Sequence, residues 1–445
     1  MDNKQMPLED IERLDMAQKP RRVAWYLRPV TWLIAFPSIW RHHSHITKIN
    51  MEGVKKPYLM LCNHNAFYDF MIATKATFPH QAYYIVAIDA FVGGGGLLKW
   101  LMYRVGCIPK RKFTNDVRLV RQLKQITDRG KIVAFYPEAR YSLVGTNAVL
   151  PPSLGKLVKL LKVPVVTLMT QGHHVNAPFW NTHDRKLPTR AVMKQILTVD
   201  QIERMSYEDI IALIDKEFFY DDFAWQKENK IRTTYKKRAQ GLHKVLYQCP
   251  HCKTEYRMES SGTELWCNHC GHRWTMDEYS ELHAVEGETY FSHVPTWFNW
   301  ERENVRQEVL AGTYGNTVTA AVRSLPNPRR FIDIGDAQLT HNMEGFHLKG
   351  LHKGFEYSLT LPVKQLYSVH IEFSYLKWKR DCIDLSTLTD TFFIFPYGDD
   401  FSVTKMSLAT EELYNKESGV YDRYVEEVDK IIAEQKEQPS ADKTE

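Results

Sequence analysis

PYLMLCNHNAFYD, residues 57–69, decides how the first half of this chain is interpreted. A short apolar run is followed at once by Asn63 and His64, and Asp69 comes five residues after the histidine. An apolar run of this length that ends in polar residues is typical of a buried strand that stops at a strand-to-helix turn. A carboxylate at such a turn can orient an imidazole and stabilise the imidazolium that forms. His64 is therefore a candidate general base, a kind of help that contributes roughly 10²–10⁴-fold in rate.

The spacing of this pair carries little information without its context. The chain has 18 histidines, so a chance match to H-x4-D is expected, and His272 with Asp277 supplies one. That second pair has no apolar strand before it, and we interpret it as a bystander. The alternative for His64 and Asp69 themselves is a structural hydrogen bond or a helix cap.

Short apolar runs alternate with helical stretches from residue 57 to residue 170. The strand-like runs are PYLMLCNH, AYYIVAIDAF, KIVAFYPE and VPVVTLMT, and the helical stretches lie around 69–76, 97–105, 115–129 and 153–161. This alternation predicts an α/β fold with a mixed, largely parallel sheet flanked by helices. Ligands of such sheets bind near the carboxyl ends of the strands, which is where the N-H and P-E dipeptides fall.

Three further motifs follow the N-H-x4-D segment in order. They are GCIPKRK (106–112), FYPE (135–138) and VPVV (163–166). Together the four segments resemble the blocks N-H-x4-D, G-x-(I/F)-x-x-x-R, F-P-E-G-x-R-S and V-P-(V/I)-(V/I) of the glycerophospholipid acyltransferase family. The best-known members of that family are 1-acylglycerol-3-phosphate acyltransferases. The combination is specific to the family, whereas each block alone is not.

The resemblance implies a role for each matched residue. His64 would be the base and Asp69 its orienting partner, while the second block's arginine falls on Lys112, with Arg111 beside it. Either cation could hold an acceptor phosphate by charge-assisted hydrogen bonds. Glu138 would take part in acceptor binding. From the residues alone, Glu138 could instead cap a helix, and the two cations could be a solvated charge run.

The third block departs from the family pattern. Ala139 stands at the family's glycine, Tyr141 stands at its arginine, and an arginine is present one place earlier, at Arg140. A one-residue shift re-aims a side chain that leaves a strand. Arg140 is retained as a candidate acceptor contact, and its shifted place puts the identity of the acceptor in question.

The resemblance implies a membrane-associated acyltransferase. It would transfer a fatty acyl group from acyl-CoA or acyl-carrier protein to the hydroxyl of lysophosphatidate or a related lysolipid, with no covalent enzyme intermediate and no catalytic cofactor. Glycerol-3-phosphate, another lysophospholipid or an amino-lipid hydroxyl are alternative acceptors. The alternative class of function is a catalytically inactive lipid-binding or scaffold protein that retains the acyltransferase fold.

Four of the seven cysteines form two C-x-x-C pairs. The arrangement C-x2-C-x14-C-x2-C consists of Cys249, Cys252, Cys267 and Cys270. This spacing predicts a zinc ribbon whose four thiolates close the coordination sphere, and therefore a structural Zn²⁺. His251 and His269 are alternative ligands. The ribbon is not strongly basic and the net charge is only +5, so no nucleic-acid partner is expected.

Residues 21–42, RRVAWYLRPVTWLIAFPSIWRH, are aromatic and apolar but are interrupted by Arg28, Pro29 and Pro37. They predict one or two short helices that lie in a membrane interface, and the alternative is a helical hairpin packed on the protein's own core. No uncharged apolar run reaches about 18 residues, so no membrane-spanning helix is predicted. With a polar N-terminus and metal-type cysteine spacing, we expect a cytoplasmic protein, peripheral on the inner face of the membrane.

Strand-like runs recur from about 327 to 405, and a helix follows at roughly 409–435. They predict a small β-barrel-like domain closed by a C-terminal helix, which resembles a pleckstrin-homology (PH) or GRAM module by pattern only. The predicted division of the 445 residues is a polar arm with interfacial amphipathic helices (1–45), an acyltransferase domain (46–205), a helical connector (206–247), a zinc ribbon (248–276), an aromatic-rich linker helix region (277–326), a PH/GRAM-like β module (327–435) and a disordered tail (436–445).

Overall fold

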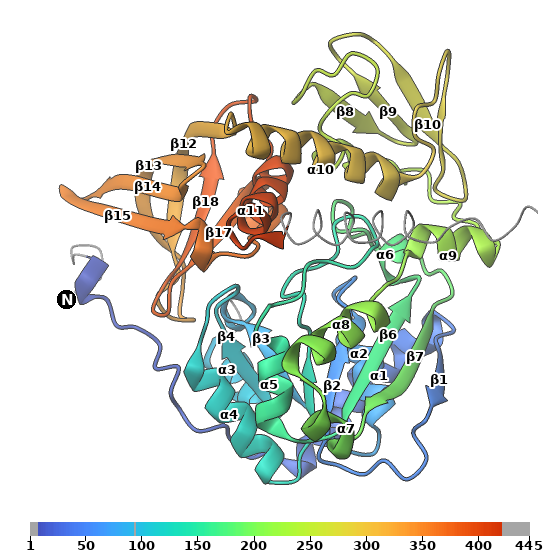
Figure 1. Cartoon of the computed structure of the whole chain (residues 1–445), viewed down its shortest axis with the longest axis vertical. Helices are drawn as coiled ribbons and strands as arrows, with labels where there is room; N and C mark the ends of the chain where they lie inside the picture. The colour runs from blue at the N-terminus through green and yellow to red at the C-terminus, as the bar shows by residue number, and fades with distance from the viewer. Residues whose placement is uncertain (1–7, 93–94, 421–445) are drawn as a thin grey trace, which may run out of the picture.

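The computed structural model describes residues 8–92 and 95–420, which build three sheets and the helices around them (Figure 1). The start of the predicted polar arm, the end of the predicted C-terminal helix and the predicted disordered tail lie outside the described residues.

The first sheet has seven strands in the order β1-β7-β6-β2-β5-β3-β4. Its strands are β1 (His45–Ile49), β2 (Leu59–Cys62), β3 (Tyr83–Ala87), β4 (Cys107–Lys110), β5 (Val133–Phe135), β6 (Val165–Gln171) and β7 (Arg190–Leu197). Every pairing is parallel except that of β6 with β7. The mixed, largely parallel sheet predicted from the sequence is therefore confirmed.

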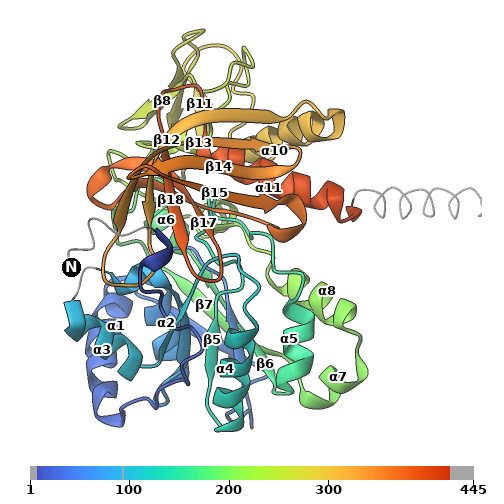
Figure 2. The same ribbon diagram turned by 90° about the vertical axis from the view of Figure 1, so that its left-hand side faces the viewer.

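Both faces of this sheet are buried, which explains why its strands are continuous apolar runs. In β2, Leu59 and Leu61 face one core, while Met60 and Cys62 face the other. The helices around the sheet are α1 (Arg28–Arg41), α2 (Asp69–Thr77), α3 (Gly95–Arg104), α4 (Val117–Asp128), α5 (Leu154–Leu161), α7 (Val199–Arg204) and α8 (Tyr207–Glu217). Helices α1 and α2 pack on the Met60 face, and α4, α5 and α8 pack on the Leu59 face (Figure 2).

The helical prediction for 206–247 holds only in part. Helix α8 and helix α9 (Asp222–Glu228) are present, but after α9 the chain forms turns, irregular segments and the short 3-10 helix η4 (Leu242–Lys244). Ile210 and Ile214 of α8 are fully buried in the same core as Leu154 of α5. The beginning of this segment therefore completes the first domain's core and does not act as a connector.

The cysteine-containing segment forms a small antiparallel sheet in the order β11-β10-β9-β8. Its strands are β8 (Met258–Ser261), β9 (Glu264–Cys267), β10 (Arg273–Met276) and β11 (Leu282–Ala284), and the long helix α10 (Val294–Ala311) follows them. Trp274 of the sheet and Trp297 of α10 are both fully buried, with ring centroids 4.9 Å apart. These two rings join the small sheet to the rest of the molecule.

The C-terminal module is a seven-stranded antiparallel sheet in the order β15-β14-β13-β12-β18-β17-β16. Its elements are β12 (Gly315–Ser324), β13 (Ile332–Asn342), β14 (Gly345–His352), β15 (Phe355–Pro362), β16 (His370–Tyr375), β17 (Arg380–Ser386), β18 (Thr391–Pro396) and the closing helix α11 (Val403–Glu417). The predicted fold class, with a β module closed by a C-terminal helix, is confirmed. The module begins earlier than the sequence suggests, because β12 lies before residue 327.

The C-terminal module sits over the end of the first sheet where β3 and β4 finish (Figures 1 and 2). The N-terminal segment also reaches the module. Arg13 forms an ion pair with Asp390, and the backbone N–H of Leu14 donates to the carbonyl oxygen of Pro326. The two halves of the chain are therefore packed against each other directly.

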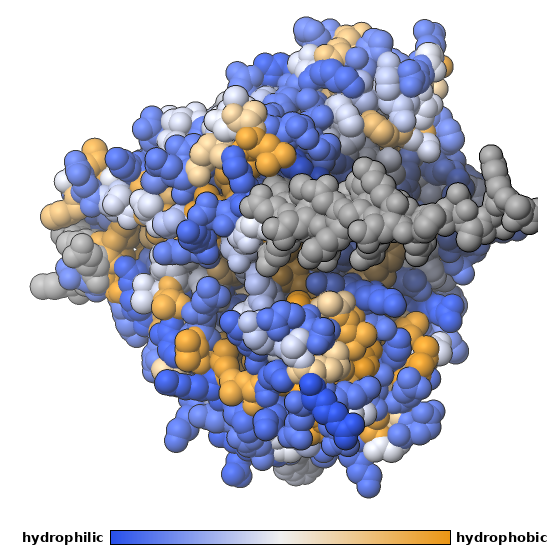
Figure 3. Space-filling model, viewed as in Figure 1, coloured by the Kyte–Doolittle hydropathy of each residue, from blue (hydrophilic) through white to orange (hydrophobic). Residues whose placement is uncertain are grey.

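Helix α1 buries only a narrow stripe, which includes Ala35 and Ile39. Several of its other apolar residues face solvent, with Leu33 74% and Trp40 80% exposed. On the molecular face shown in Figure 3, by contrast, hydrophilic residues predominate and the apolar patches are separated from one another. Among the described helices, none combines the length and the apolar character that crossing a bilayer requires.

Candidate functional site

The carboxyl ends of five parallel strands deliver polar residues to one edge of the first sheet. His64 follows β2, Asp89 follows β3, Lys112 follows β4, Glu138 follows β5 and His173 follows β6. Such an edge is where ligands bind to sheets of this kind. His64 is the residue that the sequence placed there as a base.

The loop that carries His64 is fixed to the neighbouring strand. The side chain of Asn63 accepts a hydrogen bond from the backbone N–H of Thr170 (2.7 Å) and donates one to the carbonyl oxygen of Thr170 (2.9 Å). Asn63 is fully buried, so these bonds are shielded from water. The asparagine of the N-H-x4-D segment thus ties the end of β2 to the end of β6.

Asp69 is the most heavily hydrogen-bonded group of the site. Its Oδ2 accepts from His64 Nδ1 (2.9 Å) and from the backbone N–H groups of Asn65 (2.6 Å) and Ala66 (2.9 Å). Its Oδ1 accepts from Nδ1 of His173. Burial alone would raise the pKa of Asp69, but the hydrogen bonds from His173 and His64 outweigh it and lower the pKa to about 2. Asp69 is therefore an ionised acceptor near neutral pH.

The ring of His64 is held at its Nδ1 and remains accessible. Its side chain is 23% exposed, and its ring lies against Tyr136 and Tyr141, with centroids 4.5 and 4.2 Å away. With Nδ1 bonded to the carboxylate, Nε2 is the atom left to accept a proton. This is the orientation that a general base requires.

Sequence reasoning missed His173. Its ring is 1% exposed, it bonds to the second oxygen of Asp69, and its Nε2 is buried with no hydrogen-bond partner among the described residues. The one available signal was that GHH, 172–174, directly follows a strand-like run, just as His64 does. The neighbouring His174 is equally buried, but its ring makes no hydrogen bond to Asp69.

Glu138 has a different place from the one the resemblance implied. Its Oε2 accepts from the backbone N–H of His64 (2.7 Å), and its Oε1 accepts from the backbone N–H of Ala148 (2.8 Å). The side chain is fully buried, and burial, opposed by these two bonds, raises its pKa to about 7. Glu138 therefore supports the backbone of His64, and its full burial keeps its carboxylate away from solvent and from an acceptor that enters from there.

The altered third block places its arginine outside the site. Ala139 adopts a left-handed conformation (φ 55°), which favours glycine and explains the family's glycine at this position. The guanidinium of Arg140 donates to Ser407 Oγ (2.7 Å) and Glu411 Oε1 (2.6 Å) of helix α11. Tyr141, at the family's arginine position, contacts the ring of His64, as Tyr136 does. The one-residue shift was expected to change the direction of the Arg140 side chain, and in the structure that side chain points toward the C-terminal module.

Arg111 and Lys112 also contact the C-terminal module. Arg111 donates four hydrogen bonds to it, to the carbonyl oxygens of Leu325, Pro326 and Thr389 and to Thr391 Oγ1. Lys112 Nζ lies 3.0 Å from Asp384 Oδ2 and close to two further carboxylates. Neither residue belongs to a solvated charge run, and neither has its charge free for a phosphate in this structure.

The family model described as Acyltransferase matches residues 43–171. Residues 43–171 form an acyltransferase domain. A solved structure, that of the 1-acyl-sn-glycerophosphate (LPA) acyltransferase PlsC from Thermotoga maritima, is similar at 15% sequence identity and a TM-score of 0.34, covering 43% of this chain and 77% of that chain. No curated protein matches the sequence.

Outside the acyltransferase domain, the four cysteines of the C-x-x-C pairs meet as the sequence predicts. The sulfur atoms of Cys249 and Cys270 are 3.8 Å apart, as are those of Cys252 and Cys267. All four sulfur atoms lie within 4.8 Å of one another, so the group can hold a metal ion.

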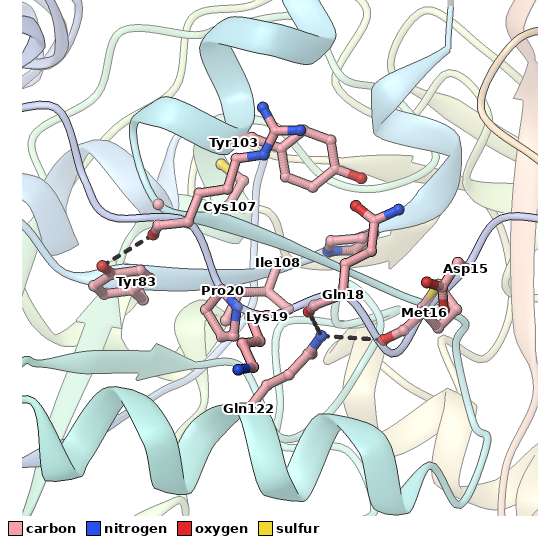
Figure 4. A pocket seen from close by; sticks show the side chains of 13 residues that line it. Asp15, Met16, Gln18, Lys19, Pro20, Tyr83, Tyr103, Cys107, Ile108 and Gln122 are labelled. Carbon is pink, nitrogen blue, oxygen red and sulfur yellow. Dashed lines mark hydrogen bonds between the residues drawn. The ribbon is translucent and has the colours of Figure 1, made fainter.

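Two cavities lie near the acyltransferase domain's ends. A small one of about 30 Å³ lies beneath residues 15–21, at the edge where β3 and β4 begin (Figure 4). Gln122 and Tyr83 close it by donating to backbone carbonyls of that segment. A larger one of about 710 Å³ lies between α1 and the His64–Asp69 loop and is lined by Pro37, Ser38, Trp40, Arg41, His42, His43, Phe67, Tyr68, Met71 and Asp184. The larger cavity borders Phe67 and Tyr68 of the loop that carries His64.

Proposed function

We propose that this protein transfers a fatty acyl group from an acyl thioester, acyl-CoA or acyl-carrier protein, to the hydroxyl of a lysophosphatidate-like lysolipid. The observation that carries the proposal is the bond between Asp69 and Nδ1 of a partly exposed His64, inside a domain of the acyltransferase family. An accessible imidazole with its other nitrogen fixed is the arrangement needed to activate a hydroxyl.

The proposed reaction is a direct transfer. His64 Nε2 takes the proton of the lysolipid hydroxyl while the hydroxyl oxygen attacks the thioester carbonyl, and Asp69 stabilises the imidazolium. The tetrahedral intermediate then expels the thiolate, which takes the proton from the imidazolium. The products are the acylated lipid and a free thiol, and the base returns to its starting state.

His173 supports this role as a positioning residue. Because Oδ1 of Asp69 is held by His173, the carboxylate plane is fixed and Oδ2 stays aimed at His64. The hydroxyl of Tyr68 donates to the backbone carbonyl of His173, which ties His173 to the loop between the base and Asp69. Loss of this support would leave the catalytic pair present but less well oriented.

We propose that α1 binds a membrane surface. Trp25, Leu33 and Trp40 are each at least 74% exposed, and Phe67, from the loop that carries His64, is 73% exposed. Helices with exposed aromatic and aliphatic residues of this kind lie in the interface of a bilayer. The cavity of about 710 Å³ lies between that helix and the loop, so a lipid leaving the bilayer would meet it on the way to the base.

We propose that the cysteine cluster holds a structural Zn²⁺. A tetrahedral zinc–thiolate site with bonds of about 2.3 Å has sulfur–sulfur distances of about 3.8 Å. The two pairs measured at 3.8 Å fit this geometry. Four sulfur ligands leave no open position, so the ion would stabilise the ribbon and take no part in acyl transfer.

Replacing the base should abolish acyl transfer. We expect His64→Ala to lower kcat by about 10²–10⁴-fold, because the hydroxyl loses its proton acceptor. Turnover is measured with purified protein, a panel of lysolipids and both classes of acyl donor. His80→Ala, which removes an exposed histidine of the same domain, is the control and should retain activity. Absence of turnover by the wild-type protein across the panel would favour the scaffold alternative.

Replacing His173 should impair catalysis more than replacing its neighbour. We expect His173→Leu to lower kcat about tenfold or more with little change in KM, because Asp69 loses one charge-assisted hydrogen bond. His173→Asn retains an N–H donor near Nδ1 and should recover most of the rate. His174→Leu is the matched control, since it changes an equally buried ring without touching Asp69. Equal losses in the two leucine variants would contradict a positioning role.

Polar substitutions on α1 should weaken membrane binding. We expect the double variant Leu33→Asn, Trp40→Asn to reduce co-sedimentation with phospholipid vesicles about tenfold or more, since two exposed apolar side chains no longer enter the interface. Phe219→Asn, at a residue 77% exposed outside α1, is the control. The prediction is wrong if both variants bind vesicles as well as the wild type does.

The ribbon should contain one zinc ion per chain. We expect elemental analysis to find it in the wild type and not in Cys249→Ser, and we expect the serine variant to unfold at a lower temperature. Tryptophan fluorescence reports the change, because Trp274 of the ribbon packs on Trp297 of α10. His269→Ala should retain the metal, because His269 is exposed and outside the cluster. Metal loss in that variant would restore His269 as a ligand.

A further inference from the structure

The cations that the resemblance assigns to an acceptor phosphate are all engaged by the C-terminal module. Arg111 binds three carbonyl oxygens and a hydroxyl of that module, and it is 2% exposed. Arg140 binds Glu411, which is also fully buried. A phosphate would have to displace the partners that already occupy the terminal nitrogens of both guanidinium groups, at the cost of leaving those partners unpaired.

Lys112 stands at the family's arginine position, and its ammonium is surrounded by acids. It lies 3.0 Å from Asp384, 3.6 Å from Asp89 and 3.9 Å from Glu372, and its side chain is 13% exposed. Asp384 and Glu372 come from strands β17 and β16 of the module, so the module brings negative charge to this edge of the sheet. One lysine among three carboxyl groups offers no surplus positive charge to an incoming anion.

Protonation of carboxyl groups makes the net charge of this cluster less negative but does not make it positive. Burial raises the pKa of Glu372 to about 7 and also raises the pKa of Asp384. For Asp89, the ammonium of Lys112 outweighs the effect of burial and lowers the pKa. The neighbouring His370 adds no positive charge near neutral pH, because burial lowers its pKa to about 3. The net charge of the cluster is therefore zero or negative when the substrate binds.

Aromatic rings occupy the space next to the base. Tyr141 takes the place of the family's third-block arginine and lies 4.2 Å from the ring of His64. Phe179 packs on Tyr141 at 5.5 Å, and Phe373 of the C-terminal module packs on Phe179 at 5.3 Å. Aromatic residues therefore lie next to His64, and the acidic cluster lies beyond them. None of the residues named here offers a cation that is free to bind an anion.

We propose that the acceptor of this acyltransferase is a lysolipid that carries no terminal phosphate monoester, and that the C-terminal module determines this selectivity by binding the three cations. A phosphate monoester carries about −1.5 to −2 charges at neutral pH. Next to Asp69, Asp89 and Asp384 it meets repulsion, and the nearby Lys112 is already paired with carboxylates. A zwitterionic phosphodiester head group or an uncharged glycerol avoids that cost. This inference rests on the proposed acyl transfer and narrows its acceptor.

The test compares acceptors that share one acyl chain. Wild-type protein is assayed with lysophosphatidate, lysophosphatidylethanolamine and monoacylglycerol, each presented in the same neutral vesicles with the same acyl-CoA. We expect kcat/KM for the better of the last two to exceed that for lysophosphatidate at least tenfold, and the pair shows whether the preferred head group is zwitterionic or uncharged. An equal or higher value for lysophosphatidate would overturn the inference while leaving acyl transfer intact. Lack of turnover with all three would remove the proposed function and this inference together.

Two substitutions examine the cause of the selectivity. Tyr141→Arg returns a cation to the family's position beside His64, and we expect it to raise the rate with lysophosphatidate relative to the other acceptors about tenfold, whereas Tyr141→Phe should leave the ratio unchanged. Lys112→Gln should affect all acceptors alike. A loss in Lys112→Gln confined to lysophosphatidate would show that Lys112 binds phosphate and would overturn the inference. If either substitution prevents folding, the wild-type comparison still decides.

Discussion

The carboxylate of Asp69 is the group on which the geometry of the site depends. It is buried and ionised, a state that is costly unless every acceptor position is used. Two imidazoles and two backbone amides use them, and they come from the β2–α2 loop and from the end of β6. The charge therefore has two effects at once. It joins two strand ends that are far apart in the sequence, and it orients the one imidazole that remains accessible.

The same requirement, that a buried charge needs partners, explains why the C-terminal module contacts Arg111 and Arg140. A guanidinium such as that of Arg111 cannot be buried without several acceptors, and the acyltransferase domain does not supply them. Backbone carbonyls at the ends of β12 and β18 do, while Glu411 of α11 serves Arg140. Residues that a family pattern would assign to a ligand have become contacts between domains. Cations of the acyltransferase domain are thus paired with acceptors of the module, although the two parts have separate sheets.

Local patterns in the sequence predicted those parts of the structure that depend on residues close together in the chain. The four helical stretches before residue 162, the largely parallel sheet and the meeting of the four cysteines follow from apolar periodicity and spacing. Strands β1, β4 and β7 were missed, and β7 pairs antiparallel with β6, which breaks the alternation that indicates a parallel sheet. His64 and Asp69 could be found because both lie in one local segment that directly follows an apolar strand-like run.

The partners of Arg111 and the role of His173 could not be found in this way. His173 lies 104 residues from Asp69 in the chain, and Leu325 lies 214 residues from Arg111. No spacing rule links residues at such separations. The one-residue shift of the arginine in the third block was informative, because Arg140 does point away from His64. The sequence could not show what Arg140 binds instead.

The hydrogen bond from Arg111 to Thr391 spans 280 residues of chain. At about 5–20 residues per second, a ribosome needs on the order of 15–55 seconds to deliver the threonine after the arginine has emerged. During that interval the nascent sheet carries a guanidinium whose acceptors do not yet exist. Translation, and not the folding of the sheet, therefore sets the earliest moment at which the C-terminal module can cover this edge of the sheet.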